Sequence, residues 1–288
     1  MKKEKISVIV TLYNRLEYAR NIIFSLLHQT LMIDELVFAD DGSKDDVADV
    51  IKDLVDRCPF EIKVVYQEDI GFRLARSRNN GARVATGDFL IFLDQDVIMP
   101  DDFIEEVFRA KKEKRIVFVR GYLTTEEQKN EIQKSIDFKY NYNKIYSIVY
   151  NKEDAEGFSK LVKKDILYKW LYKFKLRSRG AKIVGLMFAL YKKDYVELNG
   201  FDDNYKGWGK EDDDFCNRFY KYTGDIYPLK LEKYLLHMYH PFSKTKEDSP
   251  NEEYYQKRKK EISKKNYKAE NGYFNSVDGD KSWLKIIK

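Results

Sequence analysis

Residues 89–96 read FLIFLDQD, an apolar run of five side chains that ends in two aspartates, Asp94 and Asp96. A short, continuous apolar run is typical of a strand buried on both faces, as in a parallel sheet. Alternate residues of an extended chain project to the same side, so both carboxylates can face one ligand. Mg²⁺ and Mn²⁺ prefer oxygen ligands, and Mn²⁺ also accepts imidazole. The stretch therefore predicts a buried strand whose carboxyl end can supply a site for a divalent cation.

Three more strand-like runs precede this one. Residues 6–11 read ISVIVT, residues 35–39 read ELVFA, and residues 62–67 form a third run. Segments with apolar side chains at helical spacing separate the runs. This alternation predicts an α/β fold with an open, mostly parallel sheet covered by helices. The helices are expected over residues 16–29, 45–55, 76–85 and 100–111.

Polar side chains gather where three of these strands end. They occupy residues 11–14, 40–43 and 94–96. Ligands of such sheets bind beyond the carboxyl ends of the strands. A nucleotide diphosphate bound near carboxylates would need a divalent cation between the like charges. Taken alone, an Asp-x-Asp pair has a simpler explanation, which is a loop that only caps the helix near Asp101.

The overall composition limits the classes of function. The chain has 288 residues, enough for one large α/β domain or two small ones. Its 53 basic and 48 acidic residues nearly balance, so the charge does not indicate a nucleic-acid-binding protein. The two cysteines, Cys58 and Cys216, do not read as a disulfide framework. Without a signal-peptide pattern or an apolar run near the roughly 20 residues of a membrane span, we expect a cytoplasmic protein.

The strand-end motifs stand in a characteristic order. ISVIVTLYNR (6–15), FADDGSKDD (38–46) and GFRLARSRNNGARVATGDFLIFLDQDVIMP (71–100) follow one another. Together they resemble the nucleotide half of family 2 glycosyltransferases, and the resemblance covers about residues 5–105. It implies the GT-A fold, which is α/β and Rossmann-like with a mostly parallel central sheet, and a UDP-sugar as the donor.

The same resemblance implies roles for the residues at these motifs. Tyr13 would stack on the uracil, and Asp41 would accept a hydrogen bond from the uracil N–H. Asp94 would approach the ribose, Asp96 would bind the metal, and Arg78 would lie near the base or the diphosphate. The expected nucleotide-sugar-binding residues are Thr11, Tyr13, Asp41, Arg78, Asp94, Gln95 and Asp96.

A second motif lies in the other half of the chain. Residues 199–219, NGFDDNYKGWGKEDDDFCNRF, resemble the acceptor and catalytic segment of β-1,4-galactosyltransferases and are similar to that of bacterial chondroitin-type polymerases. The resemblance implies that Trp208 and Glu211 hold the acceptor sugar and that Asp212 is the general base. A carboxylate can take the proton of an attacking hydroxyl, and an indole can pack on sugar C–H groups. The alternative, a surface acidic loop, does not explain a tryptophan between two glycines.

A pair of histidines follows the last strand-like run. In the galactosyltransferases that the chain resembles, the remaining metal ligands are Met-x-x-His, and the matching positions here read His237-Met238-Tyr239-His240. On a regular strand this spacing puts the two side chains on opposite faces, so both can reach one cation only if the chain turns there. Pro241 is compatible with such a turn. We expect Mn²⁺ or Mg²⁺, bound by Asp96, His240 and His237, and the alternative is that only His240 of the two histidines binds.

The expected organisation is one GT-A domain over residues 1–245 and a basic, polar tail over residues 246–288. Residues 1–105 form the nucleotide-binding half, and residues 106–245 form the acceptor half with a helical insertion at about 124–180. The tail has no predicted core of its own. Its lysines and tyrosines at 254–268 are either a solvated helix or a contact with an anionic membrane surface at the inner face of the membrane. No motif supports nucleic-acid binding.

These features together predict an inverting, metal-dependent glycosyltransferase. It would move a hexose, with galactose or N-acetylgalactosamine favoured, from a UDP-sugar to a sugar hydroxyl of a bacterial polysaccharide or a lipid-linked oligosaccharide. Glucose and N-acetylglucosamine stay open. One alternative is a nucleotidyltransferase, which should carry a Gly-rich loop where residues 11–14 read TLYN. Another is a non-catalytic sugar-binding module, which would leave Asp94, Asp96 and Asp212 unexplained.

Overall fold

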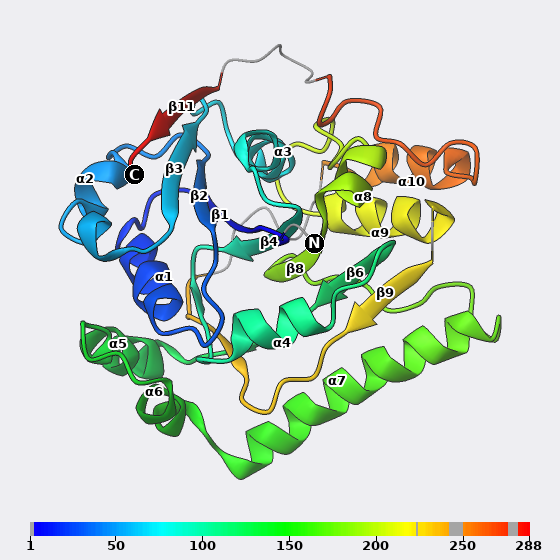
Figure 1. Ribbon diagram of the computed structural model, residues 1–288. Coiled ribbons are helices and arrows are strands. Elements are labelled where there is room, and N and C mark those ends of the chain that lie inside the picture. The colour runs from blue at the N-terminus through cyan, green and yellow to red at the C-terminus, as the bar shows by residue number, and fades with distance from the viewer. Residues whose placement is uncertain (1–2, 223, 242–249, 276–281) are drawn as a thin grey trace.

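A mixed sheet of eight strands forms the centre of the computed structural model, which describes residues 3–222, 224–241, 250–275 and 282–288 (Figure 1). The strand order is β11-β3-β2-β1-β4-β8-β6-β9. The four strands predicted from the sequence are parallel neighbours, which confirms the α/β alternation. These strands are β1 (Ile6–Leu12), β2 (Glu35–Asp40), β3 (Glu61–Tyr66) and β4 (Phe89–Asp94).

The register of the parallel strands brings their polar ends together. Thr11 of β1 is level with Asp94 of β4 on one side and with Ala39 of β2 on the other. Leu12 is paired with Asp40. The acidic residues that follow β2 and β4 therefore lie at one edge of the sheet, as the sequence predicts.

Helices cover both faces of the sheet, and each face has its own hydrophobic core. Val8 and Val10 of β1 enter one core, whereas Ile9 between them enters the other. This explains why the strand reads as a continuous apolar run rather than an alternating one. The first core contains α1 (Glu17–Leu27), α2 (Val47–Ile51) and α4 (Phe103–Arg109), and the second contains α3 (Leu74–Val84), α8 (Lys192–Glu197) and α9 (Glu211–Tyr222). A short 3₁₀ helix covers Val55–Arg57.

Beyond β4 the sheet becomes mixed. β8 (Met187–Tyr191) is antiparallel to β4 and to β6 (Arg115–Phe118), and β9 (Asp225–Pro228) is parallel to β6. A separate three-stranded sheet has the order β5-β10-β7. In it, β10 (Leu235–His237) pairs antiparallel with β5 (Val97–Ile98) and parallel with β7 (Gly121–Leu123), so that His237 lies opposite Val97, one residue from Asp96.

The segment expected as a helical insertion, residues 124–180, contains three helices. They are α5 (Glu126–Ser135), α6 (Tyr142–Val149) and α7 (Lys152–Lys173). In Figure 1 the long helix α7 runs beside β9 at the margin of the molecule. Within the described part of the chain, no helix is both long enough and apolar enough to cross a membrane.

The C-terminal residues differ from the expected separate tail. α10 (Glu252–Glu261) packs beside α9 with Tyr255 and Arg258 buried, and β11 (Trp283–Ile286) pairs antiparallel with β3 at the end of the main sheet. Buried Arg258 donates to the Lys268 carbonyl at 2.9 Å and lies 3.3 Å from Glu270. The expectation of a separate tail is wrong for the described residues, because paired arginines and tyrosines can be buried in a segment whose composition reads as polar.

Candidate active site

Three potential metal ligands converge where β4 passes into β5. The Nε2 atoms of His237 and His240 each lie 3.5 Å from a carboxylate oxygen of Asp96, and the three ligand atoms fall within 4.8 Å of one another. Arg15 lies 3.5 Å from the same carboxylate. Asp96 is buried, and within the described part of the chain its Oδ1 accepts no hydrogen bond. A buried carboxylate oxygen facing two imidazoles fits a divalent cation such as Mn²⁺.

The local chain path explains how two histidines three residues apart reach one aspartate. The Met238 N–H donates to the Asp96 carbonyl at 2.8 Å, which continues the pairing of β10 with β5. Past that point the chain leaves the strand, and the Tyr239 N–H donates to the Thr124 hydroxyl at 2.9 Å. His240 can therefore turn to the same side as His237, the condition that the sequence spacing imposed.

Asp96 and His237 shift each other's pKa. Burial raises the pKa of the Asp96 carboxyl, but His237, His240 and Arg15 outweigh it and hold this pKa below its usual value. Burial lowers the pKa of His237, whereas Asp96 raises it, and the net shift is upward. A cation bound by these ligands would place positive charge directly beside Asp96.

A second cluster surrounds Arg78, which α3 carries into the buried centre of the site. Its Nη1 lies 2.9 Å from Asp212 Oδ1 and 3.8 Å from Glu211 Oε1, and its Nη2 lies 3.7 Å from Asp94 Oδ1. Nη2 also donates to the Gly185 carbonyl at 3.0 Å. Arg78, whose side chain is buried, thus connects the strand end beside the three potential metal ligands with the first turn of α9.

The three carboxyl groups around Arg78 titrate differently. Burial, followed by the charge of Asp212, raises the pKa of Glu211. Burial also raises the pKa of Asp212, but its ion pair with Arg78 opposes that shift. Burial raises the pKa of Asp94 to about 6. One arginine cannot balance three carboxylates, of which Glu211 is the most buried, so Glu211 retains its proton most readily and Asp212 is the better placed to accept one.

The loop that carries Trp208 is held in an unusual backbone conformation. Gly207 and Gly209 have φ values of 72° and 94°, in the left-handed region that glycine tolerates without strain. The Gly207 N–H donates to the Phe72 carbonyl at 2.9 Å. The Trp208 side chain is partly exposed, in keeping with a surface on which a sugar could pack.

Asn251 fixes this loop from the C-terminal segment, a contact that sequence reasoning missed. Its side-chain amide donates to the Gly209 carbonyl at 2.8 Å, and its side-chain oxygen accepts from the Lys206 N–H at 3.1 Å. Asn251 is buried and directly precedes α10. A single asparagine in a polar segment carries no sequence pattern that would indicate its contact with the Trp208 loop.

The residues expected at the nucleotide surround the ends of β1 and β2. Thr11 donates to Asp94 at 3.4 Å, and Gln95 accepts from the Tyr13 N–H at 3.2 Å. The Tyr13 ring is exposed, with its hydroxyl 3.2 Å from Asp69. Asp41 is buried and accepts from the Gln67 side chain and the Arg73 N–H, and burial raises its pKa to about 6.

Comparisons with known families agree with this architecture. The model of glycosyl transferase family 2 matches residues 7–171, and the model described as the N-terminal domain of galactosyltransferase matches residues 165–241. The second match contains the segment 199–219 that the sequence singles out. The resemblance to family 2 and the resemblance to galactosyltransferases are both confirmed at the level of the family.

Individual relatives match parts of longer proteins. Validoxylamine A glucosyltransferase of Streptomyces hygroscopicus subsp. jinggangensis is 38% identical over 107 residues, which are 36% of this chain and 25% of that protein. Chondroitin synthase of Escherichia coli is 24% identical over 228 residues, which are 75% of this chain and 32% of that protein. The matches thus take in only about a quarter to a third of the length of these relatives.

Solved structures confirm the GT-A fold. S. aureus TarS in complex with UDP superimposes with a TM-score of 0.53 and 15% identity, over 82% of this chain and 61% of that one. At this identity the likeness concerns the fold alone. The family assignment comes from the family model, which matches more than half of the residues. This chain belongs to glycosyl transferase family 2 and carries a glycosyltransferase domain of the GT-A fold.

Proposed function

We propose that this domain is an inverting, metal-dependent glycosyltransferase that moves a hexose from a UDP-sugar to a hydroxyl of a saccharide. The observation that carries the proposal is the position of Arg78. It contacts Asp94, two residues before the metal ligand Asp96, and also Asp212 at the start of α9. A cation-binding group and a candidate base therefore belong to one connected site.

Asp212 supplies the base in this proposal. The acceptor hydroxyl loses its proton to the Asp212 carboxylate as its oxygen forms a bond to the anomeric carbon, and the bond from that carbon to the UDP oxygen breaks. Arg78 keeps Asp212 ionised and oriented through the 2.9 Å contact. With the base on the acceptor side and the cation site on the side of the leaving group, a single displacement inverts the anomeric centre.

Asp96, His237 and His240 would hold the cation, Mn²⁺ or Mg²⁺. When bound, the ion would neutralise the negative charge that grows on the departing diphosphate. Imidazole is a harder ligand than the thioether of the Met-x-x-His pattern, so we expect a site that tolerates Mg²⁺. Thr11, Tyr13, Asp41 and Gln95 would hold the uracil and the ribose on the other side of Asp94.

The identity of the sugar rests on the acceptor segment. Its likeness to galactosyltransferases favours galactose or N-acetylgalactosamine. The relative named a glucosyltransferase and the TarS complex with UDP-GlcNAc keep glucose and N-acetylglucosamine open. Trp208 and Glu211 would bind the acceptor, which we take to be a bacterial polysaccharide or a lipid-linked oligosaccharide.

We place the reaction in the cytoplasm at the inner face of the membrane. Cys58 and Cys216 are free and buried, as expected of a protein from a reducing compartment. The basic residues at 254–268 support a membrane contact only in part, because Tyr255 and Arg258 are buried in the fold. Nucleic acid has no part in the proposal.

A panel of UDP-sugars tests this function. With Mn²⁺ and no acceptor, we expect slow UDP release from one or two of them, a higher rate with an added saccharide acceptor, and loss of both with EDTA. A nucleotidyltransferase would instead release pyrophosphate from a nucleoside triphosphate and a sugar phosphate. A sugar-binding module would release neither product, and either of those outcomes would overturn the proposal.

A further inference from the structure

The outer face of α7 and the turn after it expose large apolar side chains. Leu167 is 53% exposed, Trp170 44%, Phe174 65% and Leu176 74%. Leu167, Trp170 and Phe174 follow Lys163 at intervals of four, three and four residues, so these four positions share one face. Trp170 and Phe174 stack with their ring centroids 5.9 Å apart. A cluster of exposed apolar side chains on a soluble helix marks an interaction surface.

This apolar face lies within a strongly basic segment. Between residues 160 and 179 the only acidic residue is Asp165, which is buried and paired with Arg120. The ammonium group of Lys173 lies 4.8 Å from the centre of the Trp170 ring. The segment carries eight basic residues, Lys160, Lys163, Lys164, Lys169, Lys173, Lys175, Arg177 and Arg179.

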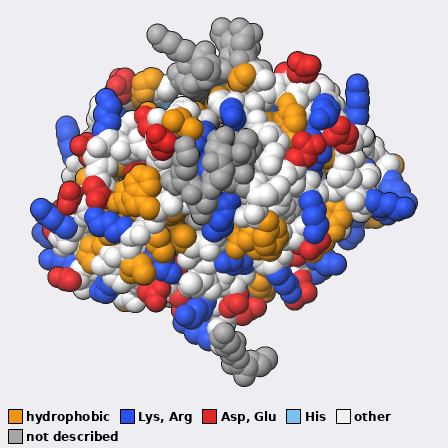
Figure 2. All heavy atoms as spheres, turned by 90° about the horizontal axis from the view of Figure 1, so that it is seen from above, with side chains coloured by type: hydrophobic (Ala, Val, Ile, Leu, Met, Phe, Trp, Pro, Cys, Tyr) orange, Lys and Arg blue, Asp and Glu red, His pale blue; other side chains and the backbone are white. Residues whose placement is uncertain are grey.

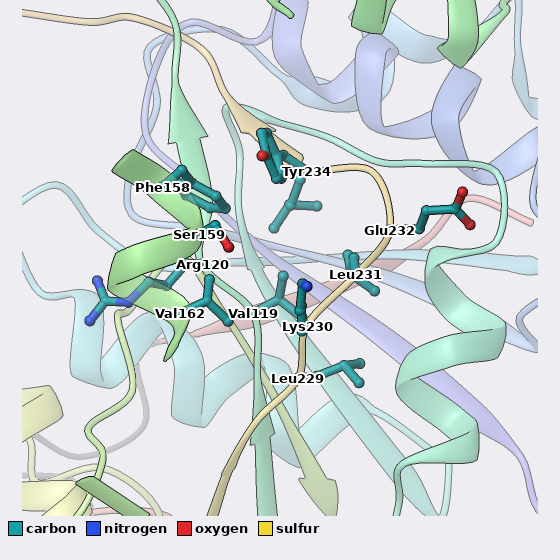
Figure 3. A pocket seen from close by; sticks show the side chains of 11 residues that line it. Val119, Arg120, Phe158, Ser159, Val162, Leu229, Lys230, Leu231, Glu232 and Tyr234 are labelled. Atoms are coloured by element: carbon teal, nitrogen blue, oxygen red, sulfur yellow. The ribbon is translucent and has the colours of Figure 1, made fainter. Parts of the chain in front are cut away.

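The opposite face of α7 is anchored to the domain. Val162 is buried, and the rings of Phe158 and Tyr234 lie 4.5 Å apart. Figure 3 shows Phe158, Ser159 and Val162 across a cavity of about 170 Å³ from the segment 229–234. Near the other end of the helix, Tyr172 contacts Tyr220 with 4.4 Å between the ring centroids. The inner face thus packs on the domain, while the outer face has no such partner among the described residues.

We propose that the outer face of α7 docks the protein on an anionic lipid surface. Lysines with an adjacent tryptophan, leucine and phenylalanine are the composition of helices that lie in a membrane interface, where the apolar side chains enter the acyl boundary and the ammonium groups meet lipid phosphates. A nucleic acid would match the charge but not the leucine and phenylalanine. A second copy of this chain would bring two such basic faces together.

The basic C-terminal segment is a weaker candidate for the same role. Residues 254–268, all of which the structure describes, expose no large apolar side chain. On the face seen in Figure 2, Lys and Arg side chains are interspersed with acidic and hydrophobic ones instead of forming one basic patch. Charge alone binds a bilayer weakly and is screened by salt. The α7 face adds the apolar contribution that residues 254–268 lack.

Docking through α7 would also orient the reaction site. Eleven residues after Phe174 the chain reaches Gly185, whose carbonyl accepts from Arg78 at 3.0 Å. A lipid-linked acceptor held in the same bilayer would then have to reach Asp212 from the surface on which α7 docks. This last consequence rests on the proposed function, whereas the docking itself does not.

Vesicle co-sedimentation of the full chain tests the docking. We expect binding to vesicles of phosphatidylcholine with phosphatidylglycerol, little binding to phosphatidylcholine alone, and weaker binding in high salt. The double variants Trp170→Ala/Phe174→Ala and Lys163→Glu/Lys164→Glu should each lower partitioning by roughly tenfold or more. The matched controls are Phe274→Ala, which removes another exposed aromatic ring, and Lys259→Glu/Lys260→Glu on α10, and both should bind as the wild type does.

UDP release from a soluble substrate, measured on the same samples, separates the two proposals. The α7 variants should retain it, because none of the four residues belongs to the site. Wild-type release without vesicle binding would overturn the docking and leave the proposed function intact. The docking would also be overturned if the α10 control, and not the α7 variants, lost vesicle binding. The same holds if the protein binds no vesicles but forms a dimer that Phe174→Ala dissociates. Vesicle binding without UDP release would contradict only the proposed function.

Discussion

At the scale of single residues, the site depends on the charges around Arg78. This guanidinium faces Asp94, Glu211 and Asp212, and stacks within 5.5 Å of the centres of the Phe188 and Phe201 rings. Removing a buried charge of this kind leaves its partners unpaired and is strongly destabilising. Informative substitutions therefore change the acids around Arg78 and leave the arginine in place.

Asp212→Asn should lower the transfer rate by roughly 10² to 10⁴-fold, because an amide cannot accept the acceptor proton. UDP-sugar affinity should stay close to wild type, since Asp212 lies on the acceptor side of the site. The matched control is Asp213→Asn, which changes the neighbouring acid that pairs with Lys182. Single-turnover kinetics with separate measurement of UDP binding distinguish the effects. Comparable rates in the two variants would remove Asp212 from its role.

The pH dependence of transfer should report the environment of Asp212. Burial raises the pKa of Asp212, and the negative charge of Asp213 raises it further. Because the base must be ionised, the rate should fall with decreasing pH at a value above the usual Asp range. Asp213→Asn removes the second contribution, so its acidic limb should move to lower pH. A limb that stays in place or moves to higher pH would show that another group controls the rate.

His240→Ala and His237→Ala test the metal site without relying on activity. Mn²⁺ with UDP should raise the melting temperature of the wild type by several degrees, because binding to the native state alone stabilises it. Each substitution removes a ligand and should weaken Mn²⁺ binding by roughly tenfold or more, at least the cost of losing a supporting contact. His28→Ala is the control, since His28 follows the last residue of α1 and its Nδ1 lies 2.8 Å from the Phe24 carbonyl. If only His240→Ala weakens Mn²⁺ binding, His237 is structural and the expected tolerance of Mg²⁺ loses its basis.

At the scale of secondary-structure elements, long apolar runs are predictable and short pairings are not. β1 to β4 have five or more residues with a clear apolar pattern, and the sequence predicts them within one or two residues. β5, β7 and β10 have two or three residues each, too few to show a period. Yet the pairing of β10 with β5 is what brings His237 to Asp96. The resemblance could suggest His237 and Asp96 as metal ligands, but the sequence could not supply this contact between them.

The C-terminal segment shows the same limit. Its lysine-rich composition predicts a polar tail, whereas tertiary contacts bury Asn251, Tyr255 and Arg258. Such contacts join residues more than forty positions apart, as the bond from Asn251 to the Gly209 carbonyl does. Composition and periodicity describe only the local chain and cannot reveal them.

Asn251→Ala should therefore weaken acceptor use although Asn251 lies outside the GWG motif. It removes two hydrogen bonds from the Trp208 loop, each contributing about 0.5–1.5 kcal/mol, and should raise the acceptor KM by roughly tenfold. UDP release without acceptor should stay unchanged, which a general loss of folding would not permit. Asn266→Ala on the exposed turn after α10 is the control. An unchanged acceptor KM would show that the loop holds its shape without Asn251.

At the scale of the whole molecule, the two halves of the chain meet along one sheet edge. Residues 1–105 supply the four parallel strands and Asp96, and the rest of the chain returns through β8, α9 and β10 to supply Asp212 and both histidines. The family and the fold were predictable because the motifs are contiguous in sequence. Arg15, Asn251 and the α7 surface were not, because their roles appear only when distant segments pack together.

The anomeric configuration of the product tests the central claim. The claim is that transfer is a single displacement, with the base on the acceptor side and the cation site on the side of the leaving group. The UDP-hexoses favoured here carry the sugar in α linkage. NMR of the disaccharide formed with Mn²⁺ should show a β linkage, with the one-bond and vicinal couplings of an inverted centre, and Asp212→Asn should form none of it. An α-linked product would contradict the single displacement and require another nucleophile in place of the roles given to Asp212 and Asp96.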